Sequence, residues 1–256
     1  MRTLTFSAIP DFPLIETGDD LSEIIIERSH QCGIRIKEND IFVLAQKIVS
    51  KTEGRLVQLS NVTPSKKAFE IAKLAEKDPR FVELILQESS EVLRVQQNTI
   101  IVQHKLGFIC ANAGIDHSNV QGKIGAPEDW VLLLPEDPDE SADRIRAEIK
   151  TKKNRNTGIL IIDSHGRAWR NGVVGISIGM AGIPGLVDLR GKPDLFGYHL
   201  RITQVAAADE LAAGASLLMG QADERTPVIH VRGFPYSFRD SRFSELVRDK
   251  KMDLFR

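Results

Sequence analysis

The sequence has few cysteines and no long apolar run. Only two of the 256 residues are cysteine, Cys32 and Cys110, which is too few for a disulfide framework or a thiolate zinc site. We therefore expect a reducing, cytoplasmic setting. No apolar run approaches the roughly 18 residues of a membrane span, and the start of the sequence lacks the apolar core of a signal peptide. We accordingly expect no membrane partner.

The sequence also lacks an excess of charge of either sign. It has 34 Lys and Arg residues against 35 Asp and Glu residues, and its formal net charge is −1. This balance gives no electrostatic reason to expect nucleic acid binding. Any anionic small molecule would have to be bound by a local cluster of basic groups. With 42% hydrophobic residues, a chain of this length can bury a full core.

Two common site motifs are missing as well. The sequence has no Gly-x-x-x-x-Gly-Lys-Ser/Thr string, which excludes a Walker-type phosphate loop. None of its six histidines forms a His-x-x-x-His pair of the kind that holds zinc. A nucleotide phosphate would therefore require a different arrangement of backbone and basic side chains.

Apolar runs and helical periodicity alternate irregularly, which predicts a mixed α+β fold. We treat residues 1–256 as a single unit. Within it, the glycine-rich stretch around 166–200 is where a smaller subdomain inserts or where partners meet. Two helices are expected between 64 and 86, broken at Asp78-Pro79. The other expected helices are 21–28, 141–152 and 202–219, and the expected strands are 3–9, 40–45, 99–102, 107–110, 130–135, 159–162 and 228–231.

Two segments place a carboxylate where a predicted strand ends. Asp116 lies in the small-residue stretch 111–119, and Asp163 directly follows 159–162 with Ser164 beside it. Carboxylate oxygens are the ligands that Mg²⁺ or Mn²⁺ prefers. The alternative is that such residues form turns by hydrogen bonding their own backbone. Two segments of the same kind favour a shared cation over two unrelated turns.

Basic residues recur after the predicted strand 40–45. Lys47, Lys51 and Arg55 are spaced by four, which on a helix would place them on one face. A solvated basic face is the alternative to a phosphate site. The position directly after a buried strand favours phosphate binding.

A second pair of basic residues flanks Trp169. Arg167 and Arg170 could offer bidentate hydrogen bonds to a carboxylate or a phosphate. A role in an ion-pair network is an equally open alternative.

The link 219–228 and two histidines are weaker candidates. Gly220 is well placed to end a helix, and Gln221 and Asp223 could reach a metal or a nucleotide, although a surface loop is the simpler interpretation. His117 and His165 fall inside the two Asp segments. Each is a candidate proton shuttle, but a loop histidine with satisfied hydrogen bonds is the favoured interpretation.

Taken in order, these segments resemble the F420-0:γ-glutamyl ligase family, also called the coenzyme F420-0:L-glutamate ligase family. The resemblance spans nearly the whole chain. It is most specific in the string Ala-Asn-Ala-Gly-Ile-Asp-x-Ser-Asn at 111–119. The other matching segments are 9–15, 45–55, 163–170, 208–210 and 219–224.

The resemblance implies an enzyme. Members of the family use GTP to add L-glutamate to coenzyme F420-0 through an acyl phosphate, and then add further γ-linked glutamates. The implied fold is a mixed-sheet α+β fold of two subdomains in an intertwined homodimer. The implied metal is Mg²⁺ or Mn²⁺, with K⁺ as a further candidate. Small molecules, namely F420-0, L-glutamate and GTP, are the implied partners.

The resemblance also implies roles for individual residues. The metal ligands are Asp116, Asp163, Ser164 and Gln221. The GTP contacts are Pro13, Leu14, Ile15, Gln46, Lys47, Lys51, Asn119, Met219, Gly220 and Asp223. The residues implied in catalysis or in holding substrate carboxylates are Lys51, Arg167 and Arg170.

Two alternatives to this function remain open at the level of sequence. One is a paralogous ligase that joins an amino acid to a different carboxylated acceptor. The other is a nucleotide- and metal-binding subunit without turnover.

Overall fold

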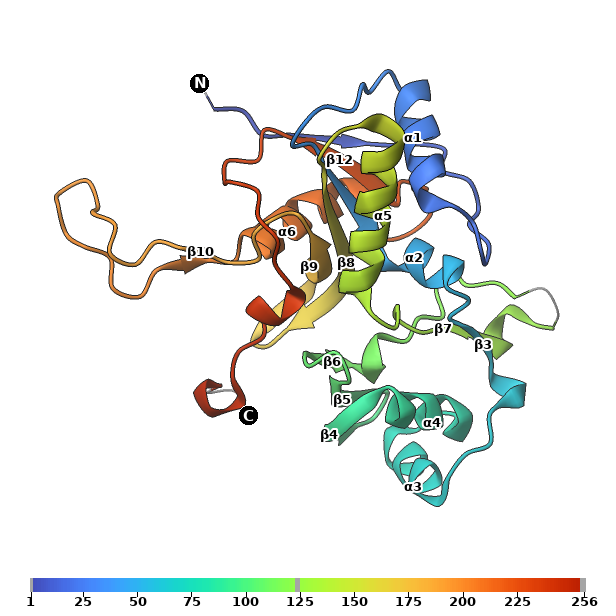
Figure 1. Cartoon of the computed structure of the whole chain (residues 1–256). Coiled ribbons are helices and arrows are strands. Elements are labelled where there is room, and N and C mark those ends of the chain that lie inside the picture. Colours follow the sequence, from blue (N-terminus) through green and yellow to red (C-terminus); the bar gives the residue numbers. More distant parts are fainter. Residues whose placement is uncertain (1, 123–124, 254–256) are drawn as a thin grey trace.

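The computed structural model describes residues 2–122 and 125–253, and a five-stranded sheet lies at its centre (Figure 1). The strand order is β1-β12-β2-β8-β9. β2 and β8 are parallel, whereas the other neighbours are antiparallel. The α+β class with a mixed sheet is therefore confirmed. The bounds are Thr5–Ala8 for β1, Ile41–Ala45 for β2, Gly158–Arg167 for β8, Arg170–Ala181 for β9 and Val228–Arg232 for β12.

Alternate residues of this sheet face different helical layers. Phe42 and Leu44 of β2 belong to a core cluster that includes side chains of α1 (Leu21–Gln31) and α5 (Pro138–Lys153). Ile41 and Val43 belong to a second cluster, on the other face, with side chains of α6 (Ala207–Met219). The two-residue period of a strand produces this separation. β2 and the first half of β8, residues 158–162, are thus buried on both faces, as their continuous apolar sequences predict.

The short helix α2 (Gln46–Thr52) begins directly where β2 ends. Ala45 has the extended backbone conformation of an N-cap residue, and the next residue is already helical. Lys47 and Lys51 are consequently one helical turn apart on one face. The predicted helical spacing is therefore confirmed for these two lysines, whereas Arg55 lies beyond the end of α2.

A second group of elements lies below the large sheet in Figure 1. Helices α3 (Lys66–Ala75) and α4 (Pro79–Gln87) are separated at Asp78, whose carboxylate accepts a hydrogen bond from the backbone N–H of Arg80. The predicted break at Asp78-Pro79 is therefore confirmed. The predicted hairpin is confirmed as well, since β5 (Thr99–His104) pairs antiparallel with β6 (Ile109–Ala111). Sequence analysis did not anticipate β4 (Ser89–Gln96), the outer neighbour of β5, because its polar residues gave no strong alternation.

Shorter elements connect these two groups. β3 (Leu56–Gln58) pairs antiparallel with β7 (Trp130–Leu132), and Leu132, the last residue of β7, also forms an isolated bridge with Asp116. Within residues 2–122 and 125–253, the short 3-10 helices are Leu59–Asn61, Asn112–Gly114, Pro127–Asp129, Phe243–Glu245 and Lys250–Met252.

The segment after 162 differs from its predicted course. The expected strand 159–162 does not end before Asp163 but continues as β8 to Arg167, and β9 returns antiparallel from Arg170. The carboxylate of Asp163 is therefore carried by a strand interior and not by a strand end. The hairpin was not predicted, because its polar and glycine residues interrupt the apolar pattern from which strands are predicted.

Two predicted helices begin at other residues. α5 starts at Pro138, because Asp137 caps it by accepting from the N–H of Glu140 over 3.0 Å. The helix expected at 141–152 thus begins three residues earlier, with the acidic residues Asp139 and Glu140 in its first turn. α6 starts at Ala207 and not at 202, since β11 (Gln204–Val205) precedes it and pairs with β10 (Val187–Asp188). These two strands form the base of an arm that extends away from the sheet in Figure 1.

Across 2–122 and 125–253, no helix combines the length and apolar character that crossing a bilayer requires.

Candidate active site

A polar pocket lies where the large sheet, α2 and the β6–β7 connection meet. Its cavity volume is about 200 Å³. Four separate parts of the chain contribute its walls: α2, the segment after β6, β8 and the segment after α6. The lining residues are Lys47, Ala111, Asn112, Gly114, Ile115, Asp116, Ser118, Asp163, Ser164 and Gln221. All four predicted metal ligands are among them.

The segment after β6 is shaped to direct Asp116 into this pocket. Asn112 and Ala113 both adopt positive φ angles, of 51° and 54°, and the side chain of Asn112 accepts a hydrogen bond from the N–H of Ile100 over 3.0 Å. Two backbone hydrogen bonds, of 3.0 and 2.9 Å, join Asp116 to Leu132. The carboxylate therefore projects from a backbone that is tied on both sides.

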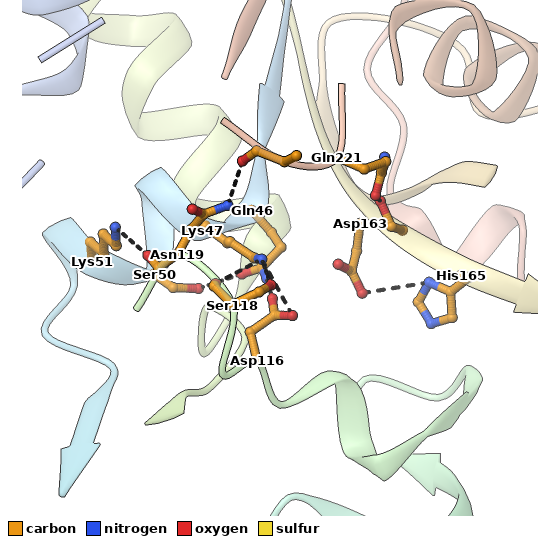
Figure 2. Close-up of polar contacts among 12 residues, drawn as sticks. Gln46, Lys47, Ser50, Lys51, Asp116, Ser118, Asn119, Asp163, His165 and Gln221 are labelled. Atoms are coloured by element: carbon orange, nitrogen blue, oxygen red, sulfur yellow. Dashed lines mark hydrogen bonds and ion pairs between the residues drawn. The ribbon is translucent and has the colours of Figure 1, made fainter. Parts of the chain in front are cut away.

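The side chain of Asp116 contacts two residues of α2. Its Oδ2 accepts a hydrogen bond from Nε2 of Gln46 over 2.7 Å, and Nζ of Lys47 lies 3.4 Å from its Oδ1 (Figure 2). Burial raises the pKa of Asp116, while the charge of Lys47 acts in the opposite direction. The carboxylate is thus partly neutralised by one flexible ammonium group.

Asp163 approaches the same space from β8. Burial, and after it the charge of Asp116, raise the pKa of Asp163 to about 7. The ring of His165 is its other neighbour, with Nδ1 at 3.6 Å from Oδ2 (Figure 2). Burial lowers the pKa of His165 to about 4, so the imidazole is neutral at pH 7 and supplies no counter-charge. Two partly buried carboxylates, one of which raises the pKa of the other, are the charge distribution that a divalent cation would relieve.

Ser164 and Gln221 complete the oxygen set. The hydroxyl of Ser164 donates to Oε1 of Gln221 over 3.0 Å, which ties β8 to the segment after α6. Within the described residues, no group of three or more His, Cys, Asp and Glu side chains could hold a metal ion. A cation here would therefore depend on the two carboxylates, on neutral oxygens and on oxygens of a bound substrate, as Mg²⁺ commonly does in nucleotide enzymes.

The basic side chains of α2 line the neighbouring surface. Nζ of Lys47 donates to the carbonyl and the hydroxyl of Ser118, over 3.1 and 2.9 Å, and Nζ of Lys51 donates to the carbonyl of Asn119 over 3.0 Å. Burial, followed by the charge of Lys47, lowers the pKa of Lys51. The side chain of Asn119 in turn donates to the carbonyl of Ala222 over 2.9 Å. These contacts bring three of the predicted GTP contacts together beside the carboxylates.

Arg55 does not join this group. Its guanidinium donates to the carbonyl of Leu134 over 2.8 Å and forms an ion pair of 2.7 Å with Glu88. The predicted basic face thus extends over Lys47 and Lys51 only.

The other predicted nucleotide contacts lie outside the pocket lining. Pro13 and Leu14 are exposed, whereas Ile15 is buried. The loop that carries them is attached to the end of α2, since the N–H of Gly18 donates to the carbonyl of Thr52 over 2.9 Å. Met219 ends α6, Gly220 follows with φ +71°, and Asp223 is exposed.

Arg167 and Arg170 lie at the far end of the β8–β9 hairpin. They pair with each other in register across its turn, and both are exposed. Trp169 between them is 88% exposed. Neither arginine lines the pocket, although the strand that carries Arg167 also carries Asp163 and Ser164.

The two candidate histidines and a buried serine of β9 lie in different surroundings. His165 is buried, with no hydrogen-bond partner for either ring nitrogen in the described part of the chain, so it is not a satisfied loop histidine. His117 packs on Phe81, with 4.9 Å between ring centroids. The string 175–179 has the Gly-x-Ser-x-Gly spacing of a nucleophile elbow, but Ser177 is buried inside β9. It therefore lacks the strand-to-helix turn that exposes such a nucleophile.

Sequence analysis assigned no role to two residues that shape the pocket. Asn112 shapes the backbone before Asp116, and Ser50 contacts Gln46 from behind the pocket. The signal for Ser50 was available, because it lies four residues after Gln46 and therefore on the same helical face. The signal for Asn112 was weaker, since only its tolerance for positive φ marks it.

Comparison with known proteins finds one matching family and several similar sequences. A family model described as F420-0:Gamma-glutamyl ligase matches residues 11–233. A protein named coenzyme F420:L-glutamate ligase from Methanothermobacter thermautotrophicus is 41% identical over 255 residues, covering 99% of each chain. Proteins of the same name from Methanocaldococcus jannaschii and Archaeoglobus fulgidus are 42% and 39% identical, covering 96% and 100% of this chain and 94% and 97% of their own.

Proposed function

Because this chain belongs to the F420-0:γ-glutamyl ligase family, we propose that it joins L-glutamate to the carboxylate of F420-0 with GTP and a divalent cation. Further glutamates would follow by γ-linkage. One observation carries this proposal: the carboxylates of Asp116 and Asp163 face the same small pocket, beside the ammonium groups of α2. A site for a metal and a polyphosphate needs both features.

The proposed metal ligands are Asp116, Asp163, Ser164 and Gln221. Their oxygens match the preference of Mg²⁺ or Mn²⁺, and the raised pKa values of both carboxyl groups indicate that a cation would stabilise their charged forms. When bound, the metal would neutralise phosphoryl oxygens and help to align the transfer. K⁺ is proposed as a further ion, without an assigned ligand set.

The proposed nucleotide site surrounds α2. Lys47 and Lys51 would pair with phosphate oxygens in place of the backbone carbonyls that they contact in this structure. Gln46 and Asn119 would add polar contacts. Pro13, Leu14, Ile15, Met219, Gly220 and Asp223 belong to the two segments that border this region, and we propose that they enclose the nucleoside.

The proposed chemistry overcomes the weak electrophilicity of a carboxylate. The γ-phosphoryl group of GTP is transferred to the acceptor carboxylate, which yields GDP and an acyl phosphate. The amine of glutamate then attacks the acyl carbon, phosphate leaves, and an amide forms with loss of a proton. Lys51 would stabilise the negative charge that develops on the transferred phosphoryl group. Arg167 and Arg170, farther along the hairpin, would hold substrate carboxylates or the phosphate of the acceptor.

We further propose a homodimer in which the arm between β10 and β11 contacts the partner. The arm carries three large apolar side chains that are almost fully exposed in the single chain: Leu195 at 96%, Phe196 at 94% and Ile202 at 88%. Exposed apolar groups of this size on one segment are typical of an interface. The arm lies largely within the 166–200 stretch, for which partner contact was one of the two expectations.

Mass spectrometry tests the proposed reaction and separates the alternatives. The protein is incubated with F420-0, GTP, Mn²⁺ and L-glutamate, and the expected product is F420-0 with one or more added glutamyl residues and GDP in equal amount to the amide bonds formed. GDP formation only with a different carboxylated acceptor would support a paralogous ligase. GTP binding without turnover for any acceptor would support a non-catalytic subunit.

A further inference from the structure

A buried hydroxyl lies directly behind the pocket, on α2. Oγ of Ser50 donates to Oε1 of Gln46 over 2.8 Å, one helical turn away. Both residues are almost completely buried, Ser50 at 0% exposed and Gln46 at 1%. Because a side-chain amide has an acceptor on one side and donors on the other, the hydrogen bond to its oxygen also fixes the direction of its NH₂ group.

The NH₂ group of Gln46 points to the two carboxylates. Its Nε2 donates to Asp116 over 2.7 Å, and the same amide hydrogen bonds to Asp163. Figure 2 shows Ser50 and Gln46 on α2 with Asp116 on the far side of the amide. A rotated amide would instead place Oε1 against a carboxylate oxygen, which is repulsive. The ionised carboxylates, which only accept, therefore select the amide orientation, and the hydrogen bond from Ser50 holds the amide in place.

Ser50 is not a member of the pocket lining, so it contributes no ligand of its own. Its backbone is engaged separately, since its carbonyl accepts from the N–H of Arg55 over 3.0 Å. The hydroxyl can therefore be removed without disturbing the turn that ends α2. Such outer contacts commonly set the orientation of metal-binding side chains.

We propose that Ser50 is a positioning residue which, through the amide of Gln46, holds the carboxylates of Asp116 and Asp163 in the arrangement that accepts a divalent cation. The inference rests on the metal site of the proposed function. It extends that site by a residue that touches neither metal nor substrate.

The test is Mn²⁺ affinity, measured by electron paramagnetic resonance with GDP present and without turnover. Ser50→Ala is expected to weaken Mn²⁺ binding about fivefold, in line with the loss of one buried hydrogen bond. Gln46→Met, which keeps the length of the side chain, is expected to weaken it about tenfold. In the double variant, Ser50→Ala should add no further loss, because its effect passes through Gln46.

Ser29→Ala is the matched control. Ser29 is also a fully buried serine on a helix, and its Oγ has no hydrogen-bond partner among the described residues. Its replacement should leave Mn²⁺ affinity unchanged. Should Ser50→Ala fail to fold, Ser50→Cys, which has a similar shape and a weaker donor, is expected to show a smaller but measurable loss.

The outcomes distinguish the two levels of the proposal. Wild-type affinity in the Ser50 variants, or losses that add fully in the double variant, would overturn the positioning role of Ser50 alone. A wild-type protein that binds no Mn²⁺ would instead contradict the proposed metal site.

Discussion

Asp163 and Asp116 lie on different elements but oppose each other's ionisation in one pocket, and together with burial this raises the pKa of Asp163 to about 7. The acidic form of Asp163 therefore favours the folded protein in the absence of a cation. When the pKa of a carboxyl group is higher in the folded than in the unfolded state, ionisation of that group lowers the stability of the folded protein. The ionised carboxylates of the pocket thus destabilise the folded protein, and a bound cation would remove this destabilisation.

A first prediction concerns the pH dependence of stability without metal. The wild-type protein in a chelator should lose stability relative to Asp163→Asn as the pH rises from about 4 to about 7, and the difference should then level off. The sign follows because the folded state retains the proton of Asp163 over this interval while the unfolded state does not. Urea unfolding at a series of pH values measures the difference. A constant difference from pH 4 to 8 would show that the pKa of Asp163 is not raised.

A second prediction concerns Asp116. Asp116→Asn should lower turnover by more than about 100-fold, because one of the two charged ligands for the metal is lost. Its thermal unfolding temperature should not fall, since the substitution removes a partly buried charge whose pKa burial raises. Product formation and circular dichroism melting are the two measurements. Full turnover in Asp116→Asn would remove this residue from the metal site.

A third prediction concerns the opposite end of the sheet. Asp40 is 1% exposed and accepts hydrogen bonds from Arg232 over 2.8 and 2.7 Å, with Nε2 of His230 at 2.9 Å. Burial alone would raise the pKa of Asp40, but Arg232 and His230 outweigh it and hold the pKa at about 2. Asp40→Asn should lower the free energy of unfolding by about 3 kcal/mol at pH 7.

The lowered pKa of Asp40 also predicts how its contribution to the free energy of unfolding depends on pH. The sign of this dependence is opposite to that for Asp163. The stabilisation from Asp40 is present above its ordinary pKa of 3.8 and is lost as the pH falls toward 2. Asp188→Asn is a suitable control, because Asp188 pairs with Arg190 on the exposed arm, and exposed pairs contribute little. Equal stability of the Asp40 and Asp188 variants at pH 7 would contradict the structural role of Asp40.

A fourth prediction concerns assembly. Phe196→Asp should convert the proposed dimer into a monomer while leaving the secondary structure unchanged, because Phe196 lies on the arm and is 94% exposed in the single chain. Light scattering coupled to size exclusion measures the mass. Leu74→Asp, which changes an exposed residue of α3 instead, should leave the mass unchanged. A wild-type protein that is monomeric at all concentrations would contradict the proposed interface.

Much of the fold could be predicted from the sequence where pattern and burial agree. β2 and β12 were predicted because burial on both faces of a strand produces a continuous apolar run in the sequence. The helix break was predicted because Asp78-Pro79 is a typical start of a new helix. The hairpin β8–β9 could not be predicted beyond Ile162. Its outer half is exposed and polar, so it lacks the apolar pattern that marks a strand, although the paired residues are close in sequence.

The candidate site shows a similar division. The predicted metal ligands were Asp116, Asp163, Ser164 and Gln221, on the basis of polar residues after predicted strands and of the family resemblance. In the structure, all four line one pocket. The sequence did not show that Arg55 pairs with Glu88, or that the ring nitrogens of His165 are buried without a hydrogen-bond partner in the described residues. Both facts depend on which segments pack together, and local spacing carries no information about that.

The most direct test of the account is the product formed from F420-0, GTP, Mn²⁺ and L-glutamate by the wild-type protein and by Asp116→Asn. We predict glutamylated F420 with one GDP for each amide bond in the wild-type reaction, and neither product in the variant. Glutamylated F420 formed equally by both proteins, or its absence from the wild-type reaction despite bound GTP and Mn²⁺, would contradict the account.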